Sequence, residues 1–89
     1  MRITNMLSSN GNEVPNQFVI KQDNGDVAFQ SYQSIIAIKR NDGTIVLDIN
    51  KWDYSVTTGK YRNQFLNETK KETLNKIKNG IYKLEDLNK

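Results

Sequence analysis

Two turn signals, each between segments of alternating hydrophobicity, constrain the fold of this chain more than any other feature. The first is Asn24-Gly25, between FVIK and DVAFQS, and the second is Asp42-Gly43, between SIIAIK and TIVLDI. Such pairs favour β-hairpins because both turn positions adopt positive φ angles. We therefore expect two hairpins that together form an antiparallel sheet.

A two-residue turn at each signal sets the expected strand register. In the first hairpin it places Ile20 opposite Phe29, and in the second it places Ile38 opposite Leu47. This register puts one apolar set of the first hairpin on a single face of the sheet: Phe18, Ile20, Val27 and Phe29. We expect that face to need a cover from the rest of the chain.

The hydrophobic period changes after Trp52, and helix signals follow. Thr57 or Thr58 is placed to cap a short helix that runs to about residue 66. Thr69 and Glu72 have the spacing of a capping box, and Gly80 is placed to end the helix that this box begins. Two C-terminal helices are therefore expected to cover the sheet.

The expected fold is α+β, with one domain over residues 1–89. An antiparallel sheet of four to five strands, built from the two hairpins, packs on one face against the two C-terminal helices. RITNML near the N-terminus is the candidate for the additional strand, and residues 81–89 are predicted to end the chain as a short strand.

The chain lacks cysteine and histidine. This composition excludes disulfides, thiol nucleophiles, imidazole bases and the usual zinc sites. We expect no enzyme activity, no catalytic residues, no metal and no cofactor. No stretch is apolar enough to cross a membrane, and the first residues lack the apolar core of a signal peptide, so we expect a cytoplasmic protein without a membrane partner.

The net charge of +3 is unevenly distributed along the chain. Residues 1–50 carry four cations and five anions, whereas residues 51–89 carry nine cations and five anions. A basic half can direct a protein towards nucleic acid or an acidic protein surface. Lysines on the solvated sides of ordinary helices produce the same asymmetry, so composition leaves both interpretations open.

The segment WDYSVTTGKYRNQFL, residues 52–66, is the strongest candidate for a binding surface. Tyrosine, tryptophan and arginine are enriched at the centres of protein interfaces, and aromatic rings beside cations also suit unpaired bases. The residues that we expect to contact a partner are Trp52, Tyr54, Lys60, Arg62, Lys70 and Lys71. The same aromatic residues also suit the contact between a sheet and its helices, which would need no ligand.

Four phrases of the chain together resemble a family: NMLSSNGNEVPNQFVI, FQSYQSIIAIK, WDYSVTTGKYRNQFL and TKKETLNKIKNG. The resemblance is to a small uncharacterised domain found as short standalone proteins in bacteriophages and related mobile elements. It implies a phage accessory protein in a bacterial cytoplasm that binds a host protein, such as an inhibitor of CRISPR or restriction defence. The alternatives are a weakly selective nucleic-acid-binding protein and a structural or self-assembling phage component, and a homodimer is compatible with each.

Overall fold

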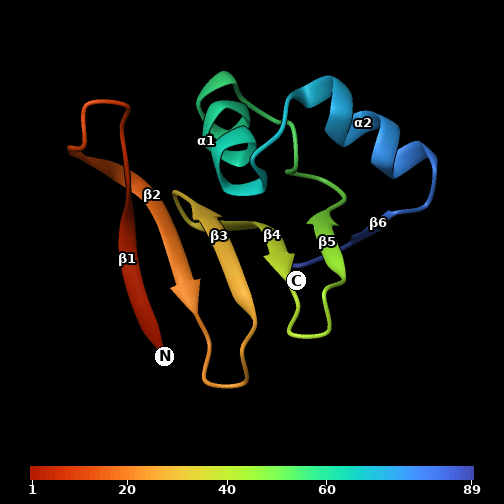
Figure 1. Ribbon diagram of the computed structural model, residues 1–89, viewed down its shortest axis with the longest axis horizontal. Helices are drawn as coiled ribbons and strands as arrows, with labels where there is room; N and C mark the ends of the chain where they lie inside the picture. Colours follow the sequence, from red (N-terminus) through yellow and green to blue (C-terminus); the bar gives the residue numbers. More distant parts are fainter.

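The computed structural model describes residues 1–89 as a six-stranded sheet with two helices (Figure 1). In chain order the elements are β1 (Arg2–Leu7), β2 (Glu13–Lys21), β3 (Val27–Ser31), β4 (Ser34–Lys39), β5 (Ile45–Asp48), α1 (Val56–Leu66), α2 (Lys70–Lys78) and β6 (Tyr82–Glu85). The α+β class is confirmed. Neither helix is long and apolar enough to cross a membrane.

The strands lie side by side in chain order, from β1 at one edge to β6 at the other. The first five pair antiparallel, and β6 pairs parallel to β5 after the chain has passed through both helices. The expected count of four to five strands is therefore too low. Both chain ends contribute a strand, and the C-terminal one is parallel because a helical crossover returns the chain in the same direction.

Both hairpins lie where the sequence predicted them, but the predicted strand register is wrong. Each has a three-residue loop: Gln22 and Arg40 donate backbone hydrogen bonds to Asp26 and Thr44 at 2.8 Å. Within each loop the glycine has a positive φ, 96° for Gly25 and 91° for the glycine of the second loop. A turn followed by a left-handed residue is the usual form of such loops. One more residue enters each loop than a two-residue turn allows.

The extra loop residue moves every side chain of one strand to the other face relative to its partner. Phe29 pairs with Val19, and Ile20 pairs with Ala28. Phe18 and Ile20 therefore lie on the face opposite Phe29, so the expected single apolar set is divided between the two faces. In the second hairpin Leu47 pairs with Ala37 in place of Ile38.

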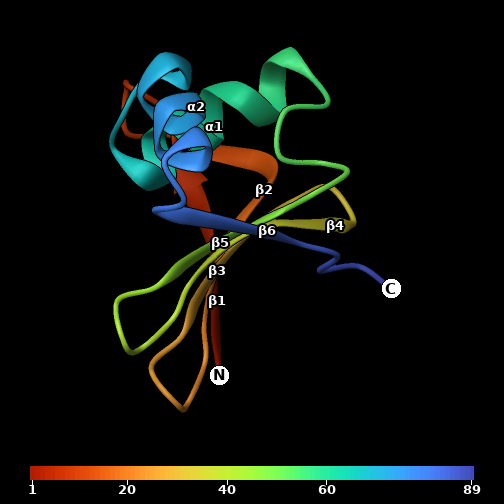
Figure 2. The same cartoon turned by 90° about the vertical axis from the view of Figure 1, so that its right-hand side faces the viewer.

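The main core lies between one face of the sheet and the helices (Figure 2). The rings of Phe29 and Phe65 stack with centroids 5.7 Å apart, and Tyr61 shares the buried side of α1 as expected. The other buried members are Met6, Ile36, Ala37, Leu47, Leu66 and Tyr82. A bulge where β4 passes β3 lets Ile36 and Ala37 both enter this core.

The opposite face of the sheet also carries apolar side chains, and no helix covers it. Cross-strand pairing aligns one row over five strands: Ile3, Ile20, Ala28, Ile38 and Val46. Val46 is 1% exposed at the β5 end of the row, whereas Ile3 is 55% exposed at the β1 edge. The row is therefore shielded at one end and open at the other.

Side chains at their first turns fix where both helices begin. Ser55, ahead of the expected threonines, is the N-cap of α1, and its hydroxyl accepts the backbone N–H of Thr58. The capping box between Thr69 and Glu72 is confirmed at the start of α2. These caps satisfy backbone donors that have no partner within the helix.

Candidate functional site

A shallow depression of about 810 Å³ lies where the chain leaves the sheet and enters α1. Its lining comes from the turn before α1, from the first two turns of α1 and from the start of α2: Asp53, Tyr54, Ser55, Val56, Gly59, Lys60, Arg62, Asn63 and Lys70. Helix capping holds this start in place, because the Thr58 hydroxyl bonds to both Ser55 at 3.0 Å and Ser31 of β3 at 2.9 Å.

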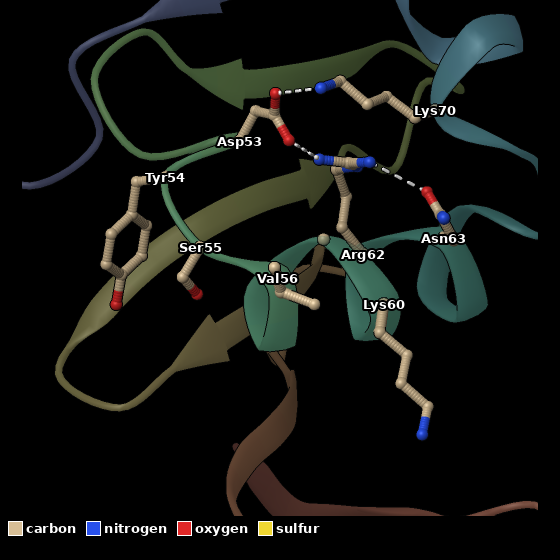
Figure 3. A pocket seen from close by; sticks show the side chains of 9 residues that line it. Asp53, Tyr54, Ser55, Val56, Lys60, Arg62, Asn63 and Lys70 are labelled. Carbon is tan, nitrogen blue, oxygen red and sulfur yellow. Dashed lines mark hydrogen bonds and ion pairs between the residues drawn. The ribbon is translucent and has the colours of Figure 1, made fainter.

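Asp53 joins the elements that surround the depression (Figure 3). Its Oδ1 accepts from Arg62 Nη1 at 3.2 Å, and its Oδ2 lies 2.7 Å from Lys70 Nζ. Partial burial would raise the pKa of Asp53, but the bonds from Lys70 and Arg62 outweigh it and hold that pKa below its ordinary value. The carboxylate therefore stays charged and ties α1 to α2.

Arg62 forms the floor of the depression. Its side chain is 1% exposed, and its guanidinium lies 5.2 Å from the ring of Trp52. Nη1 also donates to the carbonyl oxygen of Trp52 at 2.7 Å, and Nη2 donates to Asn63 at 2.9 Å. A buried guanidinium needs this kind of fixed polar partner to offset its lost hydration.

The rim of the depression is exposed and cationic. Tyr54 is 44% exposed, and the ammonium of Lys51 lies 4.7 Å from the centre of its ring. Lys60 is exposed, and its side chain extends away from the Asp53 network in Figure 3. Neither lysine forms an ion pair within the chain, and α1 has no acidic side chain in its first turn. The rim therefore has an excess of positive charge.

The structure brings together four of the six residues expected to contact a partner: Tyr54, Lys60, Arg62 and Lys70. Trp52 lies half-buried against the core beneath them, and Lys71 is exposed on α2 outside the lining. Sequence reasoning missed Asp53 as the link among these groups, although its position between two aromatic residues and near several cations was a usable signal.

The arrangement is suited to non-covalent binding of anions. Exposed ammonium groups and the start of a helix attract negative charge, the Tyr54 hydroxyl can donate a hydrogen bond to an anion, and the one carboxylate is already paired. The depression is also open and shallow, which suits a protruding side chain of a macromolecule better than an enclosed small ligand.

A family of unknown function (DUF8033) matches residues 1–81, which include the whole depression. The chain belongs to this family. The match also spans β1–β5 and both helices, and it ends just before β6. Comparisons with curated proteins and with solved structures give no match.

Proposed function

We propose that this member of the DUF8033 family is a non-catalytic binding protein whose depression at the start of α1 receives acidic side chains of a partner protein. The observation that carries this proposal is the unpaired positive charge on the rim above a buried floor, where hydrogen bonds hold both terminal nitrogens of Arg62. Lys51 and Lys60 have no anionic partner within the chain, whereas Arg62 is fixed by Trp52 and Asp53. Such a surface loses little side-chain freedom when it binds, because its floor is already ordered.

The distribution of ion pairs favours an acidic protein over nucleic acid as the partner. Asp53 forms ion pairs with Lys70 and Arg62, and Glu68 forms one with Lys76, so three cations of the basic half already have an anionic partner. Binding to a phosphate backbone needs several free cations along the path of the strand. A compact rim of two lysines fits a small acidic patch better.

The exposed aromatic ring of the site supports the same choice. Stacking on an unpaired base needs a free ring face. The Lys51 ammonium lies over the ring of Tyr54 at 4.7 Å, so a base would have to displace it. A carboxylate, in contrast, can bind Lys51 while that cation stays above the ring.

The biological setting that we propose rests on the sequence resemblance alone. In that setting the chain is a bacteriophage accessory protein in the host cytoplasm, and its partner is a host protein such as a CRISPR or restriction component. The rim would occlude an acidic surface of that component and thereby inhibit it. Inhibition of this kind needs no reactive side chain, which accords with the absence of cysteine and histidine.

The test compares two charge-reversed variants with the same change in net charge. Lys51→Glu/Lys60→Glu reverses the rim, and Lys21→Glu/Lys83→Glu reverses two exposed strand lysines away from the depression. Proteins captured from a bacterial lysate are quantified for each variant after circular dichroism has confirmed folding. We expect the rim variant to lose its partner by about tenfold or more, equivalent to about 1.4 kcal/mol, and the control to retain it. Equal recovery by both variants would reject the proposed surface.

A salt titration with a defined probe separates the nucleic-acid alternative. The probe is a single-stranded oligonucleotide. Its binding would support the alternative, and overturn the protein-binding proposal, if the affinity fell steeply and log-linearly with salt and if the rim variant abolished it. Chemical-shift changes at Gly59 and Lys60 with an oligoglutamate peptide, and none with the oligonucleotide, would support an acidic protein partner.

A further inference from the structure

The two edges of the sheet differ in how well they are protected against pairing with another strand. At one edge, β6 has four residues, of which Lys83 and Glu85 are charged. At the other, β1 has six residues, of which Arg2 alone is charged, and Figure 1 shows no element beyond it. Proteins usually protect edge strands with charges, proline or short length, because unpaired backbone groups attract further strands. Apart from Arg2, the β1 edge has none of these three. Its pairing with β2 shifts register between Asn5 and Leu7, and Gln64 of α1 donates to the carbonyl of Leu7 at 2.9 Å.

Two large apolar side chains of β1 are exposed at a spacing of four residues. Ile3 is 55% exposed and Leu7 is 49% exposed, while Met6 between them turns into the core. Residues four apart in a strand lie on the same face. Ile3 is also the open end of the apolar row that crosses the sheet through Ile20 to Val46. The exposed edge and the exposed end of the row therefore coincide.

We propose that a second copy of this chain covers the β1 edge, with the two β1 strands antiparallel about a two-fold axis at Asn5. In this register Asn5 lies opposite Asn5 of the second copy, and Ile3 lies opposite Leu7 of the second copy. Each exposed apolar side chain then gains an apolar neighbour, and the two sheets become one sheet of twelve strands. The apolar rows of the two copies approach each other along the same face.

The charges of β1 are compatible with this pairing. Arg2 lies opposite Ser8 of the second copy, so the two arginines remain at opposite ends of the contact. Antiparallel strands with like charges directly opposite each other are destabilised, and this register avoids that arrangement. A two-fold contact also closes on itself and gives a dimer rather than a fibre.

The dimer surface is separate from the proposed binding surface. No residue that lines the depression at the start of α1 belongs to β1. The variant Lys51→Glu/Lys60→Glu is therefore expected to remain dimeric. The two proposals can fail independently. Partner capture tests the binding surface, whereas mass and cross-linking measurements test the dimer.

Single-cysteine variants test the register, since the natural chain has no cysteine. Directly opposed residues of antiparallel strands have Cα atoms about 4.5–5.5 Å apart, within the range of about 4.4–6.8 Å that disulfides adopt. We expect Asn5→Cys to form a disulfide-linked dimer under mild oxidation in much higher yield than Val56→Cys, whose position is 91% exposed and outside β1. An equal mixture of Ile3→Cys and Leu7→Cys should cross-link better than either variant alone.

Light scattering supplies the independent measurement of mass. The wild-type chain should approach twice the monomer mass as its concentration rises, whereas Ile3→Lys/Leu7→Lys should remain monomeric. Val56→Lys/Ile81→Lys, at two exposed apolar positions outside β1, should dimerise like the wild type. A wild-type chain that is monomeric at every concentration would overturn the proposal. Cross-linking of Asn5→Cys no better than that of Val56→Cys would also overturn it.

Discussion

At the scale of single residues, the site depends on groups whose burial differs from what their type suggests. Arg62 is among the most polar side chains of the chain and is 1% exposed. Trp52, Asp53 and Asn63 accept hydrogen bonds from its two terminal nitrogens, whereas its Nε has no partner. Sequence spacing showed that these residues are near one another but not that the arginine turns inward. That outcome depends on how the turn after β5 folds back over α1. Arg62 therefore supports the rim from below and presents almost no surface to solvent.

Glu68 is another charged residue whose side chain is almost fully buried, and it ties the connection between the helices to β6. Its side chain is 3% exposed and accepts hydrogen bonds from Lys76, Thr73 and Tyr82 at 2.7, 2.5 and 2.7 Å. Burial would raise the pKa of Glu68, but the bonds from Lys76, Thr73 and Tyr82 outweigh this and lower it. The same burial, together with the adjacent carboxylate, raises the pKa of Tyr82.

We predict that Glu68→Gln lowers the free energy of unfolding at neutral pH by about 1–3 kcal/mol, since hydrogen bonds to a charged acceptor are weakened. Because the pKa of Glu68 is lower in the folded than in the unfolded chain, the carboxylate stabilises the fold fully above about pH 5. This contribution is lost as the pH falls through the folded value. The difference between wild type and variant, measured by urea denaturation, should therefore shrink on acidification. Glu13→Gln, at an exposed position, is the control: its free energy of unfolding should match that of the wild type both at neutral pH and after acidification.

At the scale of elements, the sequence located the hairpins and both helices but not the faces of the strands. Phe18, Val19 and Ile20 are consecutive and apolar, and both faces of β2 carry apolar groups. Alternation therefore does not decide which of them turns to the helices. The length of the hairpin loop decides which side chains face the helices. A glycine at the end of the loop is compatible with a two-residue and with a three-residue loop, so the sequence does not fix that length.

The two hairpin loops offer a matched test of this explanation. Gly25 and Gly43 have similar positive φ values, 96° and 91°, so alanine at either position should cost about 1–2 kcal/mol of strain. A Cβ at Gly25 would also lie 3.1 Å from the Cβ of Asn41, whereas one at Gly43 would meet nothing within 4 Å. We predict that Gly25→Ala lowers the urea midpoint more than Gly43→Ala. Equal midpoints for the two variants would show that the contact between the loops has no energetic role.

At the scale of the whole molecule, the last residues of the chain complete the far side of the sheet. Beyond β6, the amide of Asn88 accepts from the backbone N–H of Ile35 at 2.6 Å and donates to its carbonyl at 2.8 Å. The N–H of Leu87 donates to buried Asp48 at 2.7 Å. The two Asn88 bonds pair with the part of β4 that β5 does not reach, and the Leu87 bond holds the tail at the end of β5. Sequence patterns did not predict them, because they join residues up to 53 positions apart.

Removal of residues 86–89 should therefore weaken the β4 edge without unfolding the main core. Three hydrogen bonds are lost, and each contributes about 0.5–1.5 kcal/mol, so we expect the free energy of unfolding to fall by roughly 1.5–4.5 kcal/mol. The carboxylate of buried Asp48 would lose the N–H of Leu87 and keep only the N–H of Asn50, at 3.1 Å, so its hydrogen bonding would be less complete. In hydrogen exchange, the amide of Ile35 should lose about tenfold or more of its protection, whereas amides of β3 should change only with global stability. Removal of Lys89 alone is the control and should leave Ile35 protected, because no hydrogen bond from Lys89 reaches the sheet. Unchanged protection of Ile35 in the longer truncation would show that β4 holds this amide without the tail.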